Sequence, residues 1–393
     1  MPQIKNLIHI PMYSDPENFC AEVSVANLGG GEIVAIFAQQ RGLAHTDTGT
    51  ILLIRSLDHG RTWDPASKVV VFQQETDLGW NIAAITALTD GRLVACANCW
   101  RYLDNGRIDW QKGNSELGGV FLAWSEDKGK TWSIPQRVNI APMRTAWVRD
   151  SILELPDGKL LLPLEGHMHR RAIPYDTIGE RSRSYILCSG DGGQQWVYWG
   201  TIAYDAADIT NFSEPGMTHL ADGRLLAMLR TERFPRQAAP GEQYAPPGGY
   251  LFMVTSHDNG ISWSWPVNTG IWGYPADLIT LPAGKVLCAY SYRTQPMGVH
   301  VAISENGTIW RQEDVFTIAD YDMYKVKPTF TPRSDETPEG IATAGNFMHI
   351  GYPTSVQLDD GSILTAYHLF SRDGRQLIEG AIYQISSERL SSA

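Results

Sequence analysis

The stretch Gly249-Tyr-Leu-Phe-Met-Val-Thr-Ser-His-Asp-Asn-Gly-Ile-Ser-Trp263 predicts a β-strand, a tight turn and the start of another strand. Its turn carries the pattern Ser-x-Asp-x-Gly-x-x-Trp, with Ser256, Asp258, Gly260 and Trp263. The aspartate can accept hydrogen bonds from backbone N–H groups of its own turn, and the glycine tolerates the positive φ that such a turn needs. The tryptophan offers a large apolar anchor where the next strand begins.

The same pattern returns along the chain. Full copies start at Ser56, Ser125 and Ser189, and a shortened copy with asparagine in place of the aspartate starts at Ser304. The aspartates of the four full copies follow one another at steps of 69, 64 and 67 residues: Asp58, Asp127, Asp191 and Asp258. Such regular spacing of one turn motif is typical of a repeat architecture.

A second turn, centred on a glycine, alternates with the first. It has the form seen in Leu88-Thr-Asp-Gly91-Arg-Leu-Val94, and its six glycines are Gly31, Gly91, Gly158, Gly223, Gly284 and Gly361. Each copy predicts a hairpin between two apolar strands. Six units in 393 residues leave about 65 residues each, which is enough for four short strands.

This order predicts an all-β chain that folds as a six-bladed β-propeller. We expect one domain over residues 1–393, and the approximate blades are 18–72, 78–139, 145–204, 210–270, 271–345 and 346–393. The last unit ends after its third strand. The apolar N-terminal residues 1–12 are expected to supply the fourth strand, which closes the ring and removes two sheet edges.

In such a blade both short turns lie on one face, so the long connections lie on the other. The long segments are 101–118, 165–184, 231–248 and 311–348. Long loops at one end of a rigid scaffold usually carry function. The strand ends that line the centre of this face hold many polar residues, among them Glu22, Arg41, Asn81, Asn98, Arg149, Asp150, Glu165, His167, Glu214, Arg230, Asp277, Arg293, Tyr352 and His368. Ionisable groups are costly beside a packed core, so this ring predicts a functional pocket.

Composition excludes several classes of partner. The net charge is −11 and no basic run is present, which argues against binding to nucleic acid. No apolar run approaches membrane-spanning length, so we expect no membrane association. The N-terminus lacks the apolar core of a secretory signal, which predicts a cytoplasmic protein, or a secreted one if a signal was removed. The five cysteines are an odd number, which argues against a disulfide framework.

The sequence predicts no metal and no cofactor. Cys96 and Cys99 form a single C-x-x-C within an apolar strand, and without a second pair of ligands we interpret them as buried thiols. His167 and His169 stand two residues apart, and we interpret them as members of a polar loop rather than metal ligands.

The aspartate turns, called Asp-boxes, and the six-unit count resemble the sialidase (neuraminidase) superfamily over nearly the whole chain. More specific are Asn211-Phe-Ser-Glu214-Pro and Gly351-Tyr-Pro-Thr-Ser. The resemblance implies that Tyr352 is a nucleophile and that Glu214 is the base that deprotonates it. It also implies that Asp47, in a loop of the first unit, is the acid/base aspartate.

The resemblance also implies substrate-binding arginines. Arg230 stands sixteen residues after Glu214, and Arg293 follows Ala289-Tyr-Ser-Tyr. Sialidases have a third arginine at the start of the first blade, whereas this chain has Glu22 in Cys20-Ala-Glu-Val-Ser. Either Arg41 or Arg149 takes the place of the missing arginine from another direction, or the substrate is not a sialic acid.

Three hypotheses for function follow, and all make a glycan or oligosaccharide the partner. The first is an exo-glycoside hydrolase of sialidase type acting on a terminal acidic sugar. A sialic acid carries a carboxylate on its anomeric carbon, so a neutral tyrosine avoids the repulsion that a carboxylate nucleophile would meet.

The second hypothesis is a propeller glycosidase or polysaccharide lyase acting on another sugar, such as a uronic acid or an arabinan. It would use the carboxylates of Glu22, Glu165 and Glu214, or His167 as a base. The third is a carbohydrate-binding propeller without catalysis, against which the density of acidic and basic residues argues.

Overall fold

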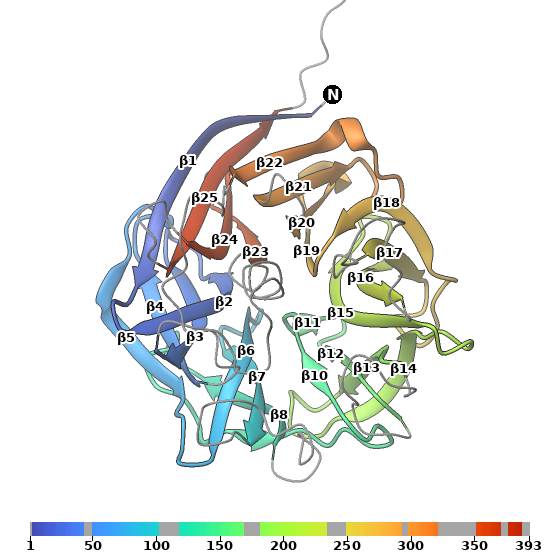
Figure 1. Cartoon of the computed structure of the whole chain (residues 1–393), viewed down its shortest axis with the longest axis horizontal. Helices are drawn as coiled ribbons and strands as arrows, with labels where there is room; N and C mark the ends of the chain where they lie inside the picture. Colours follow the sequence, from blue (N-terminus) through green and yellow to red (C-terminus); the bar gives the residue numbers. More distant parts are fainter. Residues whose placement is uncertain are drawn as a thin grey trace, which may run out of the picture.

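The computed structural model describes residues 2–42, 49–101, 118–168, 181–233, 249–292, 298–320, 351–370 and 376–386. Within these ranges the regular structure is 25 β-strands and two short 3-10 helices, so the predicted all-β class is confirmed. The strands stand around a common centre, and the first strand of each group lies nearest to it (Figure 1). No helix in the described part of the chain is long and apolar enough to cross a membrane.

One sheet brings the two ends of the described chain together. Its order is β1 (Gln3–Ser14), β25 (Gln376–Ser386), β24 (Ile363–Phe370) and β23 (Gly351–Gln357). β1 and β25 are antiparallel, with a register that runs from Gln3 opposite Ser386 to Ser14 opposite Leu377. The N-terminal strand therefore completes the last unit, as its apolar sequence predicts.

Three further sheets each contain one repeat unit. The first comprises β10 (Trp147–Val148), β11 (Leu153–Glu154), β12 (Leu160–Gly166), β13 (Arg183–Ser189) and β14 (Val197–Ala203). The second comprises β15 (Thr210–His219), β16 (Leu225–Arg233), β17 (Gly249–Ser256) and β18 (Val267–Gly273). The third comprises β19 (Ala276–Thr280), β20 (Val286–Tyr292), β21 (Gly298–Ser304) and β22 (Val315–Asp320), with helices η1 (Pro282–Gly284) and η2 (Gln312–Asp314) in its connections.

The first two units share one eight-stranded sheet. Its strands are β2 (Asn18–Asn27), β3 (Ile33–Arg41), β4 (Gly49–Ser56), β5 (Asp64–Phe72), β6 (Leu78–Ala87), β7 (Leu93–Arg101), β8 (Gly119–Ser125) and β9 (Gln136–Arg137). The two groups of four are joined by a single pair, Gly49 opposite Trp80. The described strands thus form five hydrogen-bonded sheets, and the count of six blades stays a prediction.

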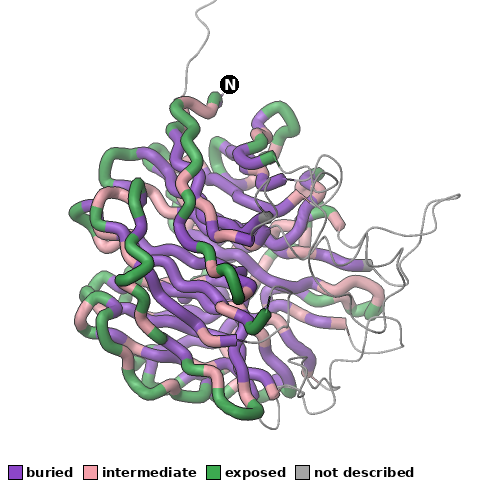
Figure 2. Tube along the Cα trace, turned by 60° about the vertical axis from the view of Figure 1, so that its left-hand side comes forward, coloured by how far each residue is buried: buried purple, intermediate pink, exposed green. Residues whose placement is uncertain are grey.

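The core lies between neighbouring groups of strands. Phe37 and Ile54 of the first unit pack in one cluster with Leu364 and Ile382 of the last, which ties the beginning of the chain to its end. Figure 2 shows burial along the middle of the strands and exposed residues at the turns. All five cysteines are buried free thiols, so the interpretation of Cys96 and Cys99 as buried thiols is confirmed.

The Asp-box turns have the hydrogen bonds that their residue types predict. Asp258 accepts a bond from the Ser262 N–H at 2.9 Å, and the Ser256 hydroxyl accepts one from the Gly260 N–H at 2.9 Å. Gly260 has a φ of 88°, as its place in the turn requires. The indole N–H of Trp263 donates back to the Gly260 carbonyl at 3.1 Å.

The tryptophans differ from expectation in one respect. Trp63 and Trp196 stand directly before a strand, β5 and β14, but Trp132 and Trp263 stand four residues before β9 and β18. In all four full copies the indole N–H donates to the carbonyl of the glycine in its own turn. The tryptophan therefore closes its turn whether or not the next strand begins directly after it.

The glycine turns also form as predicted. The six glycines have φ values between 81° and 89°: Gly31, Gly91, Gly158, Gly223, Gly284 and Gly361. The long connections predicted for the other face, 101–118, 165–184, 231–248 and 311–348, lie mostly outside the described residues.

Replacing Ser256 with alanine is expected to weaken the fold. The change leaves the buried N–H of Gly260 without its acceptor, which costs about 1–3 kcal/mol. Urea denaturation should show that loss in the free energy of unfolding. His257→Ala removes an exposed side chain of the same turn and should change stability by no more than about 0.5 kcal/mol. Equal stability of the two variants would contradict a role for the hydroxyl in holding the turn.

Candidate active site

Four first strands carry a β-bulge with a non-glycine residue in the left-handed conformation. These residues are Glu22 (φ 60°), Ile82 (φ 41°), Glu214 (φ 46°) and Tyr352 (φ 49°), and the strand pairing shifts register at each of them. A positive φ is costly for a residue with a Cβ, and a bulge re-aims the side chain. Two of the four are residues for which the sequence predicts a catalytic role.

Each bulge N–H is bonded by a side chain from another strand group. The Glu214 N–H donates to Glu165 Oε2 at 2.7 Å, and the Tyr352 N–H donates to the Ser291 hydroxyl at 3.1 Å. The Glu22 N–H bonds to His368 Nδ1 at 3.1 Å. The carboxylate of Glu22 in turn accepts the Ile82 N–H at 2.9 Å. These contacts between groups offset the strain at the bulges.

The carboxylate of Glu214 lies at the centre of the cluster. The hydroxyl of Tyr352 donates to its Oε1 at 2.9 Å, and Arg230 Nη1 donates to its Oε2 at 2.6 Å. Arg230 Nη2 donates to Glu232 Oε1 at 2.5 Å. Glu214 and Glu232 are buried, with 7% and 5% of their surface exposed. Both terminal nitrogens of Arg230 are therefore bonded to carboxylates of the protein itself.

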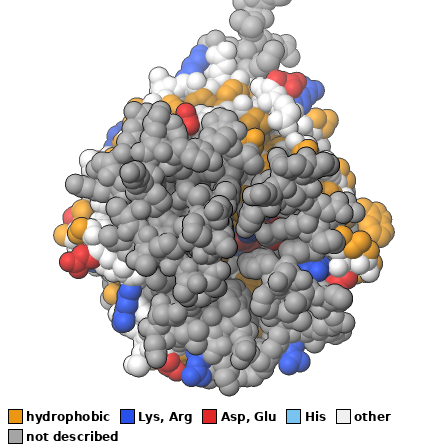
Figure 3. All heavy atoms as spheres, in the orientation of Figure 1, with side chains coloured by type: hydrophobic (Ala, Val, Ile, Leu, Met, Phe, Trp, Pro, Cys, Tyr) orange, Lys and Arg blue, Asp and Glu red, His pale blue; other side chains and the backbone are white. Residues whose placement is uncertain are grey.

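Aromatic contacts complete the cluster. Arg149 Cζ lies 4.9 Å from the centroid of the Tyr352 ring, and Arg149 Nη2 donates to the Pro353 carbonyl at 3.1 Å. The imidazole of His368 is stacked on Tyr352, with 6.2 Å between centroids and 19° between planes. Arg230 Cζ lies 4.6 Å from the centroid of Tyr274. Figure 3 shows acidic and basic side chains near the centre of this face.

Burial and neighbouring charges together set the pKa values of Glu165 and Arg230. Burial, with the nearby charge of Glu214, raises the pKa of Glu165 to about 8. Burial lowers the pKa of Arg230, but the charges of Glu214 and Glu232 outweigh that effect and raise it well above its ordinary value. At neutral pH, Arg230 therefore carries its charge and Glu165 holds a proton. This difference is typical of an acid beside a salt-bridged carboxylate in a catalytic site.

Asp150 and Asp277 form a second pair of buried carboxyl groups. Burial, with the charge of Asp150, raises the pKa of Asp277 to about 8, and Arg149 opposes this rise. Asp150 Oδ2 accepts the Met217 N–H at 2.8 Å, and Asp277 Oδ2 accepts the Ser355 N–H at 2.7 Å. Each carboxyl group thus accepts a bond from the backbone of the next group of strands. The donor is the third residue after a bulge residue, Glu214 in one case and Tyr352 in the other.

The structure brings together five of the residues predicted for the site, namely Tyr352, Glu214, Arg230, Arg149 and Glu165. Glu22 joins them through His368. His167 is buried and bonds the Thr145 hydroxyl at 2.9 Å. Arg41 is exposed at the end of β3. Asp47, Arg293 and His169 lie outside the described residues.

Sequence reasoning missed Glu232 and Tyr274, which both contact Arg230. The period of two along a strand places Glu232 on the same side as Arg230, and that signal was available. Tyr274 lies between strands, in a position that no periodicity marks.

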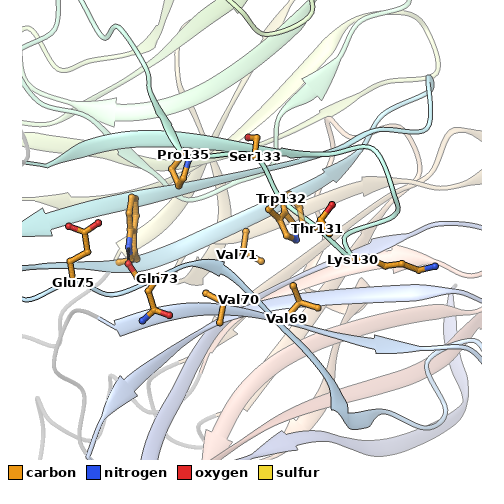
Figure 4. A pocket seen from close by; sticks show the side chains of 11 residues that line it. Val69, Val70, Val71, Gln73, Glu75, Lys130, Thr131, Trp132, Ser133 and Pro135 are labelled. Atoms are coloured by element: carbon orange, nitrogen blue, oxygen red, sulfur yellow. Dashed lines mark hydrogen bonds between the residues drawn. The ribbon is translucent and has the colours of Figure 1, made fainter.

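A separate pocket lies between β5 and the turn that follows β8 (Figure 4). Valines of β5, with Trp80 and Trp132, line it, and Glu75 and Lys130 add charge. None of the residues around Glu214 lines this pocket, so the cluster and the pocket are different places on the molecule.

Replacing Glu165 with glutamine is expected to change how stability depends on pH. The folded state holds the Glu165 proton up to a pH of about 8, whereas an unperturbed carboxyl loses it at 4.5. Its contribution to stability is complete below the lower value and is lost as the pH rises to the upper one. Urea unfolding should show wild-type stability falling over this interval, and falling less in Glu165→Gln. Because Asp277 titrates in the same direction, part of the slope should persist. An unchanged slope would contradict the raised pKa.

Residues 105–365 match the BNR repeat-like domain. The fold is similar to that of a protein of unknown function from Dyadobacter fermentans, at 22% identity and a TM-score of 0.74, over 98% of this chain and 100% of that one. It is also similar to the Hadza microbial sialidase Hz136, at 17% identity and a TM-score of 0.65, over 94% of this chain and 66% of that one. A third similar structure is the α-L-arabinanase of Penicillium chrysogenum, at 14% identity and a TM-score of 0.61, over 97% and 98% of the two chains.

At these identities the solved structures establish likeness of fold alone. The domain match covers most of the chain and confirms the resemblance that the Asp-boxes indicate. The chain belongs to the BNR repeat-like domain family, and its all-β fold is that of the sialidase-like propellers.

Proposed function

We propose that the protein is an exo-glycoside hydrolase with Tyr352 as nucleophile and Glu214 as the base that activates it. The observation that carries the proposal is the hydrogen bond from the Tyr352 hydroxyl to Glu214 Oε1 at 2.9 Å. Both residues lie on left-handed bulges of different sheets, and backbone strain of this kind is concentrated at functional sites. The family match and the fold shared with a sialidase and an arabinanase support the same reaction class.

The scaffold we propose is a closed propeller of six blades. The eight-stranded sheet divides at the single pair Gly49 and Trp80 into two groups of four strands. With the four other sheets, this division gives six groups. The cluster of Phe37 with Leu364 packs the first group against the last and supports closure of the ring.

The reaction would proceed in two steps. In the first, the Tyr352 oxygen bonds to the anomeric carbon while its proton passes to Glu214, and the bond from that carbon to the leaving oxygen breaks. An acid, for which we propose Asp47, protonates the leaving oxygen. In the second, water deprotonated by that residue attacks the anomeric carbon. The bond to Tyr352 then breaks, and the phenol recovers its proton from Glu214.

We assign Arg230 to holding Glu214 rather than to binding a substrate carboxylate. Its two terminal nitrogens already bond Glu214 and Glu232, at 2.6 and 2.5 Å. The predicted role of Arg293 in binding an acidic sugar stays a proposal. The substrate is a terminal sugar of a glycan, and a panel of umbelliferyl glycosides, acidic and uncharged, is the test of its class.

The raised pKa of Glu165 favours a second candidate function, a glycoside hydrolase with a carboxylate nucleophile. A protonated carboxyl with a pKa of about 8 suits a general acid. In this mechanism Glu214 attacks the sugar, Tyr352 holds Glu214 by donating its hydrogen bond, and Glu165 protonates the leaving oxygen. The carboxylate nucleophile would require an uncharged anomeric centre, such as that of an arabinan, and Glu22 in place of an arginine is consistent with such a substrate.

Tyr352→Phe and Glu214→Gln should each remove turnover while the fold persists. Loss of a general base alone costs about 10²- to 10⁴-fold in rate. Hydrolysis of the best umbelliferyl glycoside is the measurement. Tyr250→Phe and Glu154→Gln, which make the same changes at exposed or half-buried positions, are the matched controls and should leave the rate unaltered. Full activity in Tyr352→Phe would refute the nucleophile assignment. Glycan binding without turnover in the wild type would refute catalysis, and an unsaturated product would indicate a lyase.

Glu165→Gln separates the two mechanisms. If Glu165 is the acid, the variant should lose roughly 10²-fold or more on natural glycosidic bonds, which need protonation, and far less on umbelliferyl glycosides, which leave readily. If Tyr352 is the nucleophile and Asp47 the acid, the loss should be the same for both kinds of leaving group. The ratio of the two rates is therefore the quantity to measure.

A further inference from the structure

We propose that Arg149 is a positioning residue that favours the phenolate form of Tyr352. The inference rests on the proposed role of Tyr352 as nucleophile. The sequence makes Arg149 a candidate substitute for the missing substrate-binding arginine, whereas its position in the structure indicates a different role.

The guanidinium of Arg149 lies against the phenol ring. Its Cζ is 4.9 Å from the ring centroid, within the range of cation–π attraction. Arg149 is buried, with 4% of its surface exposed. Because water is excluded, the attraction is stronger than at a surface, and it grows as the ring gains negative charge. A charge placed in this way lowers the free energy of the phenolate relative to the phenol.

The hydrogen bond of Arg149 ties it to the nucleophile's own segment. Its Nη2 donates at 3.1 Å to the carbonyl of Pro353, the residue after Tyr352. One side chain thus contacts both the ring of Tyr352 and the backbone that follows it. This arrangement fixes the ring beside Glu214 and commits one N–H of the guanidinium to a bond within the protein.

Other charged or titratable groups also face Tyr352. In the described residues they are Glu214, which accepts the phenol hydrogen bond, Arg230, whose charge interacts with the ring, and His368, which is stacked on it. Ionised Glu214 opposes a negative charge on the phenol oxygen, whereas Arg149 and Arg230 favour it. Arg230 is already paired with Glu214 and Glu232. The charge of Arg149 also lowers the pKa values of Asp150 and Asp277, and Arg149 is the arginine whose guanidinium lies over the face of the Tyr352 ring.

The kinetic test compares Arg149→Met with Arg149→Lys on the best glycoside substrate. Methionine keeps much of the bulk but removes the charge, and kcat should fall roughly 30-fold while KM changes less than about two-fold. Lysine restores a cation near the ring, so it should recover most of kcat. Arg92→Met is the matched control, because Arg92 Cζ also lies 4.9 Å from an aromatic centroid, that of Trp124, outside the site. A raised KM with unchanged kcat in Arg149→Met would overturn the inference in favour of substrate binding.

A second measurement does not depend on activity. Subtracting the ultraviolet titration of Tyr352→Phe from that of the wild type isolates phenolate formation at Tyr352. Arg149→Met should move this titration to higher pH by roughly one unit or more, and Arg92→Met should not move it. A shift in a protein that hydrolyses no glycoside would support the role of Arg149 and refute the proposed function. An unshifted titration in both Arg149 variants would refute the role of Arg149 even if hydrolysis is found.

Discussion

The hydrogen bonds that pair the N–H groups of the left-handed bulges are the contacts on which the site depends. A bulged N–H cannot bond within its own ladder, and a buried N–H without an acceptor is costly. Glu165 supplies the acceptor for Glu214, and Ser291 supplies it for Tyr352. Because each acceptor belongs to a different group of strands from its donor, the local conformation of the site is coupled to the packing of neighbouring groups.

The same contacts explain why charged groups are stable near the core. The Glu214 carboxylate is bonded by Arg230 and Tyr352, and Arg230 is bonded again by Glu232. Glu165 keeps its proton because burial and the charge of Glu214 outweigh the opposing charge of Arg230. A protein can therefore hold several carboxyl groups in a small volume if some are ion-paired and others are neutral.

The turns that stabilise the fold and the residues of the candidate site lie on different faces of the molecule. On one face the glycine turns and Asp-boxes satisfy their own backbone groups within a few residues, as Ser256 and Asp258 do for their turn. The bonds that hold these turns do not involve the residues around Glu214. The ionisable and phenolic residues of the candidate site lie instead at the ends of inner strands, where the scaffold fixes their positions.

The sequence by itself determined the turns, the alternation of strands and the all-β class, because these features rest on contacts within about four residues. It also singled out Glu214, Arg230 and Tyr352, through motifs that resemble a known superfamily. Only the tertiary structure decided that Glu165 bonds the Glu214 N–H and that Arg149 lies over the Tyr352 ring. These contacts join residues that are far apart in the chain. Glu214 and Tyr352 have a left-handed φ although neither is a glycine, so the sequence does not mark these positions as left-handed. The strain at those positions is stabilised by the packing of separate sheets, which no local pattern encodes.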